Sequence, residues 1–189
     1  MNWNDPSTRG TNDALGSHQS DIDRSQSVST RVQTARLELI PLPAAAAAAL
    51  PGNRDEAGRL LRATLPLEWP LQDLLDVLPL QAAASGRGLI FGIWVLVERE
   101  TKTVVGDAGF KGPPAGGVVE IGYSVVPDRR RRGYASEAAR ALVDWALAQD
   151  GVDAVVGGCA PDNIATVRTL ERLGFVRTGL EGDEIRWCR

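Results

Sequence analysis

The stretch from Val118 to Leu147, VVEIGYSVVPDRRRRGYASEAARALVDWAL, decides how the rest of the chain is interpreted. Residues 118–126 are rich in β-branched and aromatic side chains, which predicts a strand, and Pro127 ends it. Apolar residues then recur at helical spacing, so a long helix is expected to begin near Ala135 or Ser136. The stretch is therefore a predicted strand, a basic turn and a helix with one buried face.

The turn between this strand and this helix has the chemistry of an anion site. It reads Arg130-Arg131-Arg132-Gly133-Tyr134-Ala135, and Ser136 follows as a helix cap or first-turn residue. A glycine here allows a tight turn and a close approach of the backbone to a ligand. The first amides of a helix have no partners within it, and the helix dipole favours negative charge there. The amides of Arg131 to Ser136 are therefore predicted to bind a pyrophosphate group.

Other phosphate-binding loops do not fit this turn. The chain contains neither G-x-x-x-x-G-K-[ST] nor G-x-G-x-x-G. The turn does match [QR]-x-x-G-x-[GA], and in its strand–turn–helix context it resembles the acetyl-CoA loop of the GNAT N-acetyltransferase superfamily. The alternative is an arginine-rich surface turn that binds no ligand.

Two more segments resemble one branch of that superfamily, the ribosomal-protein N-terminal (RimJ/RimL-like) acetyltransferases. Residues 34–42, TARLELIPL, are similar to the branch's opening T-x-R-L-x-L-x-P-L. Residues 162–175 contain DNIAT and then LGF, and are similar to its D-N-x-x-S … L-G-F segment. The resemblance covers about residues 34–189. It implies an α+β fold: a mixed, mostly antiparallel sheet with helices on both faces.

Composition sets wider bounds. The 189 residues carry a net charge of −3, so charge alone gives no reason to expect a nucleic-acid partner. The longest apolar run, Leu89 to Val97, is too short to span a bilayer, and a cytoplasmic protein without a membrane partner is expected. Residues 1–33 are polar and predicted to be a disordered tail, with the acetyltransferase domain at residues 34–189.

The rarest residue types exclude several catalytic classes. The single histidine, His18, lies in the predicted tail, which excludes Ser-His and Cys-His nucleophiles in the folded part. Cys159 and Cys188 lack metal-ligand spacing, so neither a metal nor a disulfide framework is expected.

Trp69, in the linker 65–70, is a candidate wall of the acceptor site, or a residue that simply packs on the sheet.

The periodicity of apolar residues and the positions of glycine and proline predict the remaining helices and strands. Helices are expected at 44–49, 54–63, 71–84 and 164–173, and strands at 34–42, 89–98, 104–111, 153–160, 175–179 and 184–188.

The reaction that the resemblance implies is direct transfer of an acetyl group from acetyl-CoA, a co-substrate, to a primary amine. By the same resemblance, the turn Arg130–Ser136 holds the pyrophosphate and the amides of Ser124, Val125 and Val126 hold the thioester carbonyl. Asn163 is expected to bond to the pantetheine arm; the alternative is a plain helix cap.

Two residues are candidates for proton transfer. Glu120 shares a strand face with Gly122 and Ser124, and it is the candidate base, acting through a water relay. The alternative is a carboxylate that only binds water or a cationic neighbour. Many family members carry a tyrosine acid where this chain has Leu170, and the ribosomal branch carries a serine where it has Thr166. Thr166 is therefore the candidate acid, or an ordinary helix residue.

Several questions stay open at this stage. The acceptor is a protein N-terminus, an amino acid or a small amine, and a homodimer is one alternative for the oligomeric state. A non-catalytic acyl-CoA-binding module is one rival interpretation. A nucleic-acid binder that uses Arg129 to Arg132 is the other.

Overall fold

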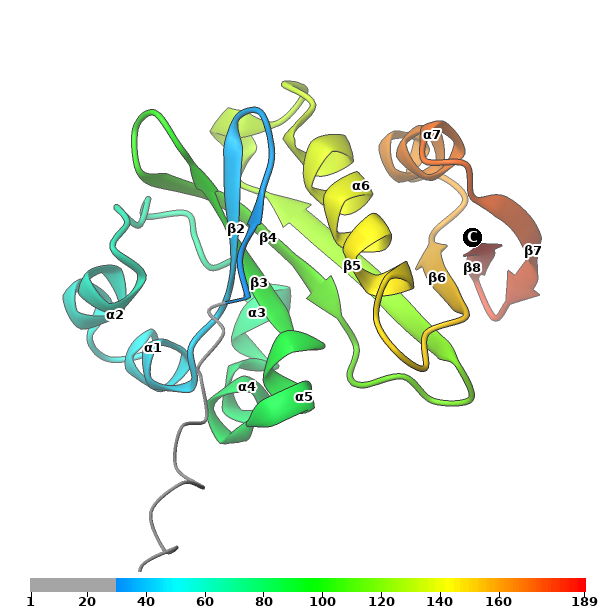
Figure 1. Cartoon of the computed structure of the whole chain (residues 1–189). Coiled ribbons are helices and arrows are strands. Elements are labelled where there is room, and N and C mark those ends of the chain that lie inside the picture. Colours follow the sequence, from blue (N-terminus) through cyan, green and yellow to red (C-terminus); the bar gives the residue numbers. More distant parts are fainter. Residues whose placement is uncertain (1–29) are drawn as a thin grey trace, which may run out of the picture.

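The computed structural model describes residues 30–189, which form one eight-stranded sheet (Figure 1). The strands are β1 (Val32–Gln33), β2 (Leu37–Pro41), β3 (Ile93–Glu98), β4 (Thr103–Phe110), β5 (Val118–Val125), β6 (Ala154–Cys159), β7 (Val176–Glu181) and β8 (Glu184–Cys188). Their order in the sheet is β1-β2-β3-β4-β5-β6-β8-β7. Only the β5–β6 pair is parallel, so the predicted mixed, mostly antiparallel sheet is confirmed.

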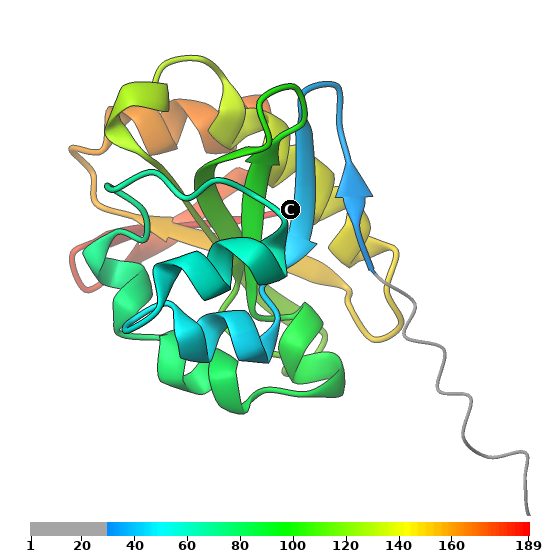
Figure 2. The ribbon, with the colours of Figure 1, turned by 90° about the vertical axis from the view of Figure 1, so that its left-hand side faces the viewer.

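Helices cover both faces of the sheet, as predicted (Figures 1 and 2). They are α1 (Ala44–Ala49), α2 (Arg54–Leu61), α3 (Gln72–Leu75), α4 (Leu78–Ala83), α5 (Gly86–Ile90), α6 (Tyr134–Leu147) and α7 (Ile164–Arg172), with the 3₁₀ turn η1 (Pro127–Arg129). One core cluster joins the sheet to α6 and α7, and a second joins its other face to α1–α4. No helix between residues 30 and 189 is both long and apolar enough to cross a membrane.

The long helix α6 packs through the face that its sequence pattern predicts. Ala138 and Leu142 are fully buried. Trp145 is half-buried, and its ring lies 5.0 Å from that of Trp94 and 5.3 Å from that of Phe91, centroid to centroid. Such tilted aromatic contacts add to the area burial that holds a helix on a sheet. The position of α6, and with it the turn before it, is thus set by the core.

Two element predictions in the first half are wrong. Residues 71–84 form two short helices, α3 and α4, because Pro79 has no amide to continue a helix and lies in the first turn of α4. Leu89 and Ile90 belong to α5 and not to a strand, and the Ile90 carbonyl accepts a bond from Trp94 Nε1 at 2.7 Å. A short, fully apolar run such as this one does not separate helix from strand by periodicity.

The boundary of the predicted tail also changes. Residues 1–29 of that prediction lie outside the described residues. Val32 and Gln33, in contrast, form β1 and pair with Leu39 and Glu38 of β2. Val32 is half-buried against the main core, so the packed part of the chain begins before residue 34.

We expect a chain that begins at Thr34 to be less stable than one that begins at Thr30. The shorter chain loses β1 and the packing of Val32, on the order of 1–2 kcal/mol for a partly buried valine. Chemical denaturation of the two chains measures the difference in unfolding free energy. Equal unfolding free energies would show that β1 contributes nothing to stability.

Candidate active site

The site begins where two neighbouring strands separate. The parallel pairing of β5 with β6 covers three residue pairs and ends at Glu120 and Val156. Beyond them β5 stays with β4 and β6 stays with β8, so a slot opens between the two strands. A cavity of ≈ 350 Å³ occupies the slot, lined by Ile121, Gly122, Tyr123, Gly157, Gly158, Cys159, Ala160, Asn163, Thr166, Leu170 and Glu184.

A second cavity, of ≈ 610 Å³, lies at the end of β5, between η1, the start of α6 and helix α7. Its lining residues are Val125, Arg129, Arg130, Arg131, Gly133, Tyr134, Ala135, Ser136, Ala165, Arg168, Thr169 and Arg172. Of its five arginines, only Arg129 makes an ion pair with another described residue, Glu98. A cavity with this much unpaired positive charge suits a ligand with several phosphate groups.

Arg168 and Arg172 are site residues that the sequence analysis missed. They lie one helical turn apart on α7 and both line this cavity. Two arginines at i, i+4 on one helix share a face, and this spacing was the signal available in the sequence. Of the predicted arginines, Arg130 and Arg131 line the cavity, whereas Arg132 does not.

The basic turn has the backbone geometry of an anion site. Gly133 precedes α6 with φ 82°, a left-handed conformation that favours glycine, and Arg131 has φ 60°. The helix begins at Tyr134, one residue earlier than expected, and Ser136 lies within its first turn and does not cap it. The first helical bond runs from the Glu137 amide to the Gly133 carbonyl, so the amides just before Glu137 have no helical acceptor.

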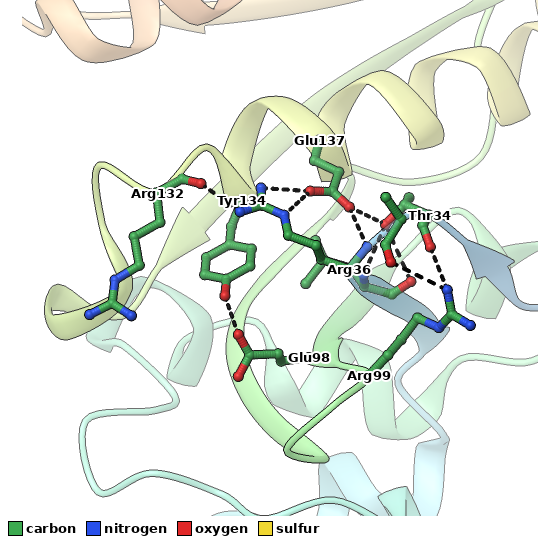
Figure 3. A network of polar contacts seen from close by, with 9 residues as sticks. Thr34, Arg36, Glu98, Arg99, Arg132, Tyr134 and Glu137 are labelled. Atoms are coloured by element: carbon green, nitrogen blue, oxygen red, sulfur yellow. Dashed lines mark hydrogen bonds and ion pairs between the residues drawn. The ribbon is translucent and has the colours of Figure 1, made fainter.

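Arg36, from the start of β2, ties this turn to the sheet (Figure 3). Its guanidinium donates to the Arg132 carbonyl at 2.8 Å and to the Glu137 carboxylate at 2.7 Å. Thr34 also donates to Glu137. Burial would raise the pKa of Glu137, but the bonds from Thr34 and Arg36 outweigh it and keep the pKa below its usual value. This anchoring role of Glu137 was not predicted from the sequence.

Tyr134 completes the same network on the other side of the turn. The Arg36 guanidinium lies over its ring, 4.5 Å from the centroid, and its hydroxyl donates to Glu98. The hydrogen bond to Glu98 raises the pKa of the tyrosine and lowers that of the carboxyl. The first residue of α6 is thus held both by a cation and by a carboxylate from β3.

Glu120, the candidate base, is held by two cations. Arg186 of β8 donates to both of its oxygens, at 2.9 and 3.3 Å, and Lys111 pairs with it as well. Burial would raise the pKa of Glu120, but these hydrogen bonds lower it overall. A carboxylate with a lowered pKa is a weak proton acceptor, so the geometry favours the alternative of a carboxylate that binds cationic neighbours.

One of the three amides expected to hold the thioester carbonyl is already used. The Val126 amide donates to the Val105 carbonyl at 3.0 Å, because the antiparallel bonding of β4 to β5 continues one residue past the strand end. The prediction for Val126 is therefore wrong. By the same alternation the Ser124 amide, opposite Asp107 in the register, also points toward β4, so the prediction for Ser124 is wrong as well. The Val125 amide points away from β4 and remains a candidate, and the Val125 carbonyl accepts from Arg130 Nε at 2.9 Å.

Asn163 and Thr166 both line the slot, at the start of α7. Asn163 caps the helix, because its side-chain oxygen accepts from the Thr166 amide at 3.1 Å. Beside them lies the buried Tyr123 hydroxyl, which is near the side chains of Thr166 and Thr169 but makes no well-formed hydrogen bond with any described residue. Burial raises the pKa of Tyr123 to about 12, so it stays a neutral donor. The strand pattern gave no reason to select this tyrosine.

A buried carboxylate, Asp107 of β4, was also missed. Its Oδ2 accepts from Trp69 Nε1 and from Ser124 Oγ, both at 2.9 Å. Trp69 is fully buried, which agrees with the alternative that it packs on the sheet. Its indole also holds this carboxylate. The signal was present in the sequence, since Asp107 is the only acidic residue in the run Val104–Phe110.

Comparison with known proteins agrees with this geometry. Residues 36–176 match the model of the acetyltransferase (GNAT) domain family. The uncharacterized N-acetyltransferase YjdG of Bacillus subtilis (strain 168) is 33% identical over 124 residues, which are 64% of this chain and 74% of YjdG.

Solved structures agree on the fold. The ribosomal-protein-S5-alanine acetyltransferase of Vibrio fischeri superposes with a TM-score of 0.57 at 15% identity, over 85% of this chain and 96% of that one. The microcin C7 self-immunity acetyltransferase MccE, solved with acetyl-CoA and AMP, gives 0.58 at 15% identity, over 82% and 93%.

A splayed pair of strands beside a cationic turn–helix junction defines an acyl-CoA-dependent acyltransferase. The family match makes the class specific: the chain belongs to the GNAT acetyltransferases. It is an enzyme that transfers the acetyl group of acetyl-CoA, and it resembles the ribosomal-protein branch in fold.

We expect Arg36→Met to weaken acetyl-CoA binding by up to about tenfold, equivalent to about 1.4 kcal/mol. Methionine keeps much of the apolar stem but removes the bonds to Arg132 and Glu137 that set the turn. Isothermal titration calorimetry measures the affinity. Arg59→Met is the control, because Arg59 is ion-paired with Glu56 on the remote helix α2. Equal affinities for the two variants would mean that the turn needs no anchor.

Proposed function

We propose that the protein is an N-acetyltransferase that moves the acetyl group of acetyl-CoA directly to a primary amine. The observation that carries this proposal is a pair of adjoining cavities, both lined by β5 and α7. One is the cationic cavity beside the turn, and the other is the slot between β5 and β6. Their order suits a molecule with phosphates at one end and a slender thioester arm at the other.

Each part of acetyl-CoA has candidate partners. The pyrophosphate lies on the amides of Arg131 to Ser136 with Arg130 beside it, and Arg168 and Arg172 take further phosphate charge. The pantetheine arm enters the slot next to Asn163. The Val125 amide, which points away from β4 on the free side of β5, would stabilise the negative charge that develops on the thioester oxygen.

The acceptor is an amine of a protein N-terminus, an amino acid or a small molecule. The fold neighbour from Vibrio fischeri is named for an alanine of a ribosomal protein, which makes a protein N-terminus one acceptor to test. Mixing the protein with acetyl-CoA and a panel of amines and N-terminal peptides, and measuring release of the free CoA thiol, tests the proposal. A chain that binds acetyl-CoA but never releases the thiol would be the non-catalytic module.

We expect Gly133→Ala to weaken acetyl-CoA binding, because a side chain disfavours φ 82° by about 1–2 kcal/mol and shifts the turn. Gly182→Ala is the matched control. Gly182 is also left-handed, with φ 57°, but it lies in the turn between β7 and β8. Calorimetric titration of both variants with acetyl-CoA separates the local effect from general strain. Unchanged affinity in a folded Gly133→Ala variant would contradict a role for this turn.

Thr166 is the proposed donor of a proton to the leaving CoA sulfur. Thr166→Val keeps the side-chain volume and removes the hydroxyl, so kcat should fall by roughly 10²-fold or more while acetyl-CoA affinity stays the same. Tyr123→Phe is tested in parallel, since its unpaired hydroxyl lines the same slot. If only the tyrosine variant loses kcat, the donor is Tyr123 and the assignment to Thr166 is wrong.

A further inference from the structure

A third, small cavity lies on the sheet face opposite α6. It has a volume of ≈ 120 Å³ and is lined by Leu74, Gly92, Ile93, Asp107, Ala108, Gly109, Phe110, Lys111 and Gly122. Gly109 of β4 and Gly122 of β5 are directly opposed in the sheet register. Two facing glycines leave the sheet without side chains at this point, and the pair Asp107–Ser124 lies next along the two strands.

Gly122 connects this cavity to the slot. It lines both of them, so at this residue only the backbone of β5 separates the two spaces. A Cβ atom added at Gly122 would meet nothing within 4 Å, which makes the space beside it open. An acceptor in the small cavity would therefore lie next to a thioester held in the slot.

The polar group of the small cavity is Asp107. Its residue is 8% exposed, and both of its hydrogen bonds, from Trp69 and Ser124, go to Oδ2. Its Oδ1 accepts no hydrogen bond from the described residues, and it is not among the fully enclosed unpaired atoms. One oxygen is thus fixed by the protein and the other is left for a ligand in the cavity.

We propose that this small cavity is the binding site for the acceptor's ammonium group, with Asp107 Oδ1 as its carboxylate partner and proton acceptor. The inference deepens the function proposed above and rests on it. Asp107 takes the place of Glu120, the base predicted from the sequence, whose two oxygens are occupied by Arg186 and Lys111.

The small size of the cavity favours a slim acceptor. At ≈ 120 Å³ it is the smallest of the three cavities. Its side chains Leu74 and Ile93 are apolar and belong to the core cluster on this face of the sheet. The cavity suits a primary ammonium on a slim carbon, such as the α-amino end of a glycine or alanine residue.

The proton balance of the step is simple. The ammonium gives one proton to Asp107, and the neutral nitrogen forms a bond to the acetyl carbon as the bond from that carbon to sulfur breaks. The second proton from nitrogen neutralises the charge left on sulfur, through the hydroxyl donor of the slot. Asp107 returns its proton to water, and the products are the N-acetyl compound and free CoA thiol.

The charges around Asp107 suit this role. Burial raises its pKa to about 6, although the bonds from Trp69 and Ser124 lower it, and Asp73 of α3 adds a further raising effect. Lys111 faces the same cavity and is paired with Glu120. Above its pKa the carboxylate binds and deprotonates the ammonium. As the pH falls through about 6 it becomes protonated, and kcat/KM should fall with it.

Asp107→Asn tests the carboxylate, because an amide keeps an oxygen for Trp69 and Ser124 but cannot take a proton. With glycinamide as acceptor, kcat/KM should fall on the order of 10²-fold or more and lose its rise through pH 6, while acetyl-CoA affinity is unchanged. Asp150→Asn, an exposed aspartate remote from the cavity, is the control and should keep full activity. Equal activity of Asp107→Asn and wild type would overturn the proposal.

The size of the site is tested with glycinamide, alaninamide and valinamide as acceptors for the wild type. The wild type should prefer glycinamide and alaninamide over valinamide, because the cavity is small and its side chains Leu74 and Ile93 are apolar. An enzyme that binds acetyl-CoA but accepts none of them, or prefers valinamide, contradicts the acceptor class. Failure to bind acetyl-CoA would instead contradict the function proposed above.

Discussion

The separation of β5 from β6 after Glu120 and Val156 is the constraint on which the rest of the molecule depends. Paired strands leave no room between them, since their backbones lie about 5 Å apart and are joined by hydrogen bonds. Where the pairing stops, β5 keeps one free edge with exposed polar groups, and a slot opens beside it. Gly157 and Gly158 of β6 line this slot and place no side chains in it. The proposed site for the thioester arm lies along this free edge.

Local charge, rather than net charge, makes the phosphate site. The chain as a whole is acidic at −3, yet five arginines from three segments line one cavity. Carboxylates stand behind this cavity and hold the turn: Glu137 accepts from Arg36, and Glu98 accepts from Tyr134. The acids in this network therefore position the backbone and leave four arginine side chains available for a ligand. A packed core beneath α6 supports this arrangement from the sheet side.

Two carboxylates on neighbouring strands, Glu120 and Asp107, have opposite pKa shifts because their surroundings differ. Glu120 lies between two cations and has a lowered pKa, whereas Asp107 is enclosed by apolar walls and neutral donors and has a raised one. The first suits a fixed ion pair that stabilises the sheet near β8. The second suits a group that exchanges protons near neutral pH. The local sequence places both acids in apolar strands but does not show which one meets cations, because the cations that bind Glu120 come from β8 and from the residue after β4.

The sequence by itself determined most strands and helices, which follow from periodicity and from glycine and proline positions. Its motifs determined the family resemblance, and that resemblance implied the fold class. The left-handed stop after α7 is an example: Gly174 and the bond from the Phe175 amide to Leu170 are as the local pattern predicts. Tertiary structure decided what depends on residues distant in the chain. The clamp of Arg36 on Glu137, the use of the Val126 amide and the bond from Trp69 to Asp107 each need a partner far away in the chain. Hydrogen-bond partners and burial set the availability of an amide and the pKa of a carboxylate, and both exist only once the sheet has formed.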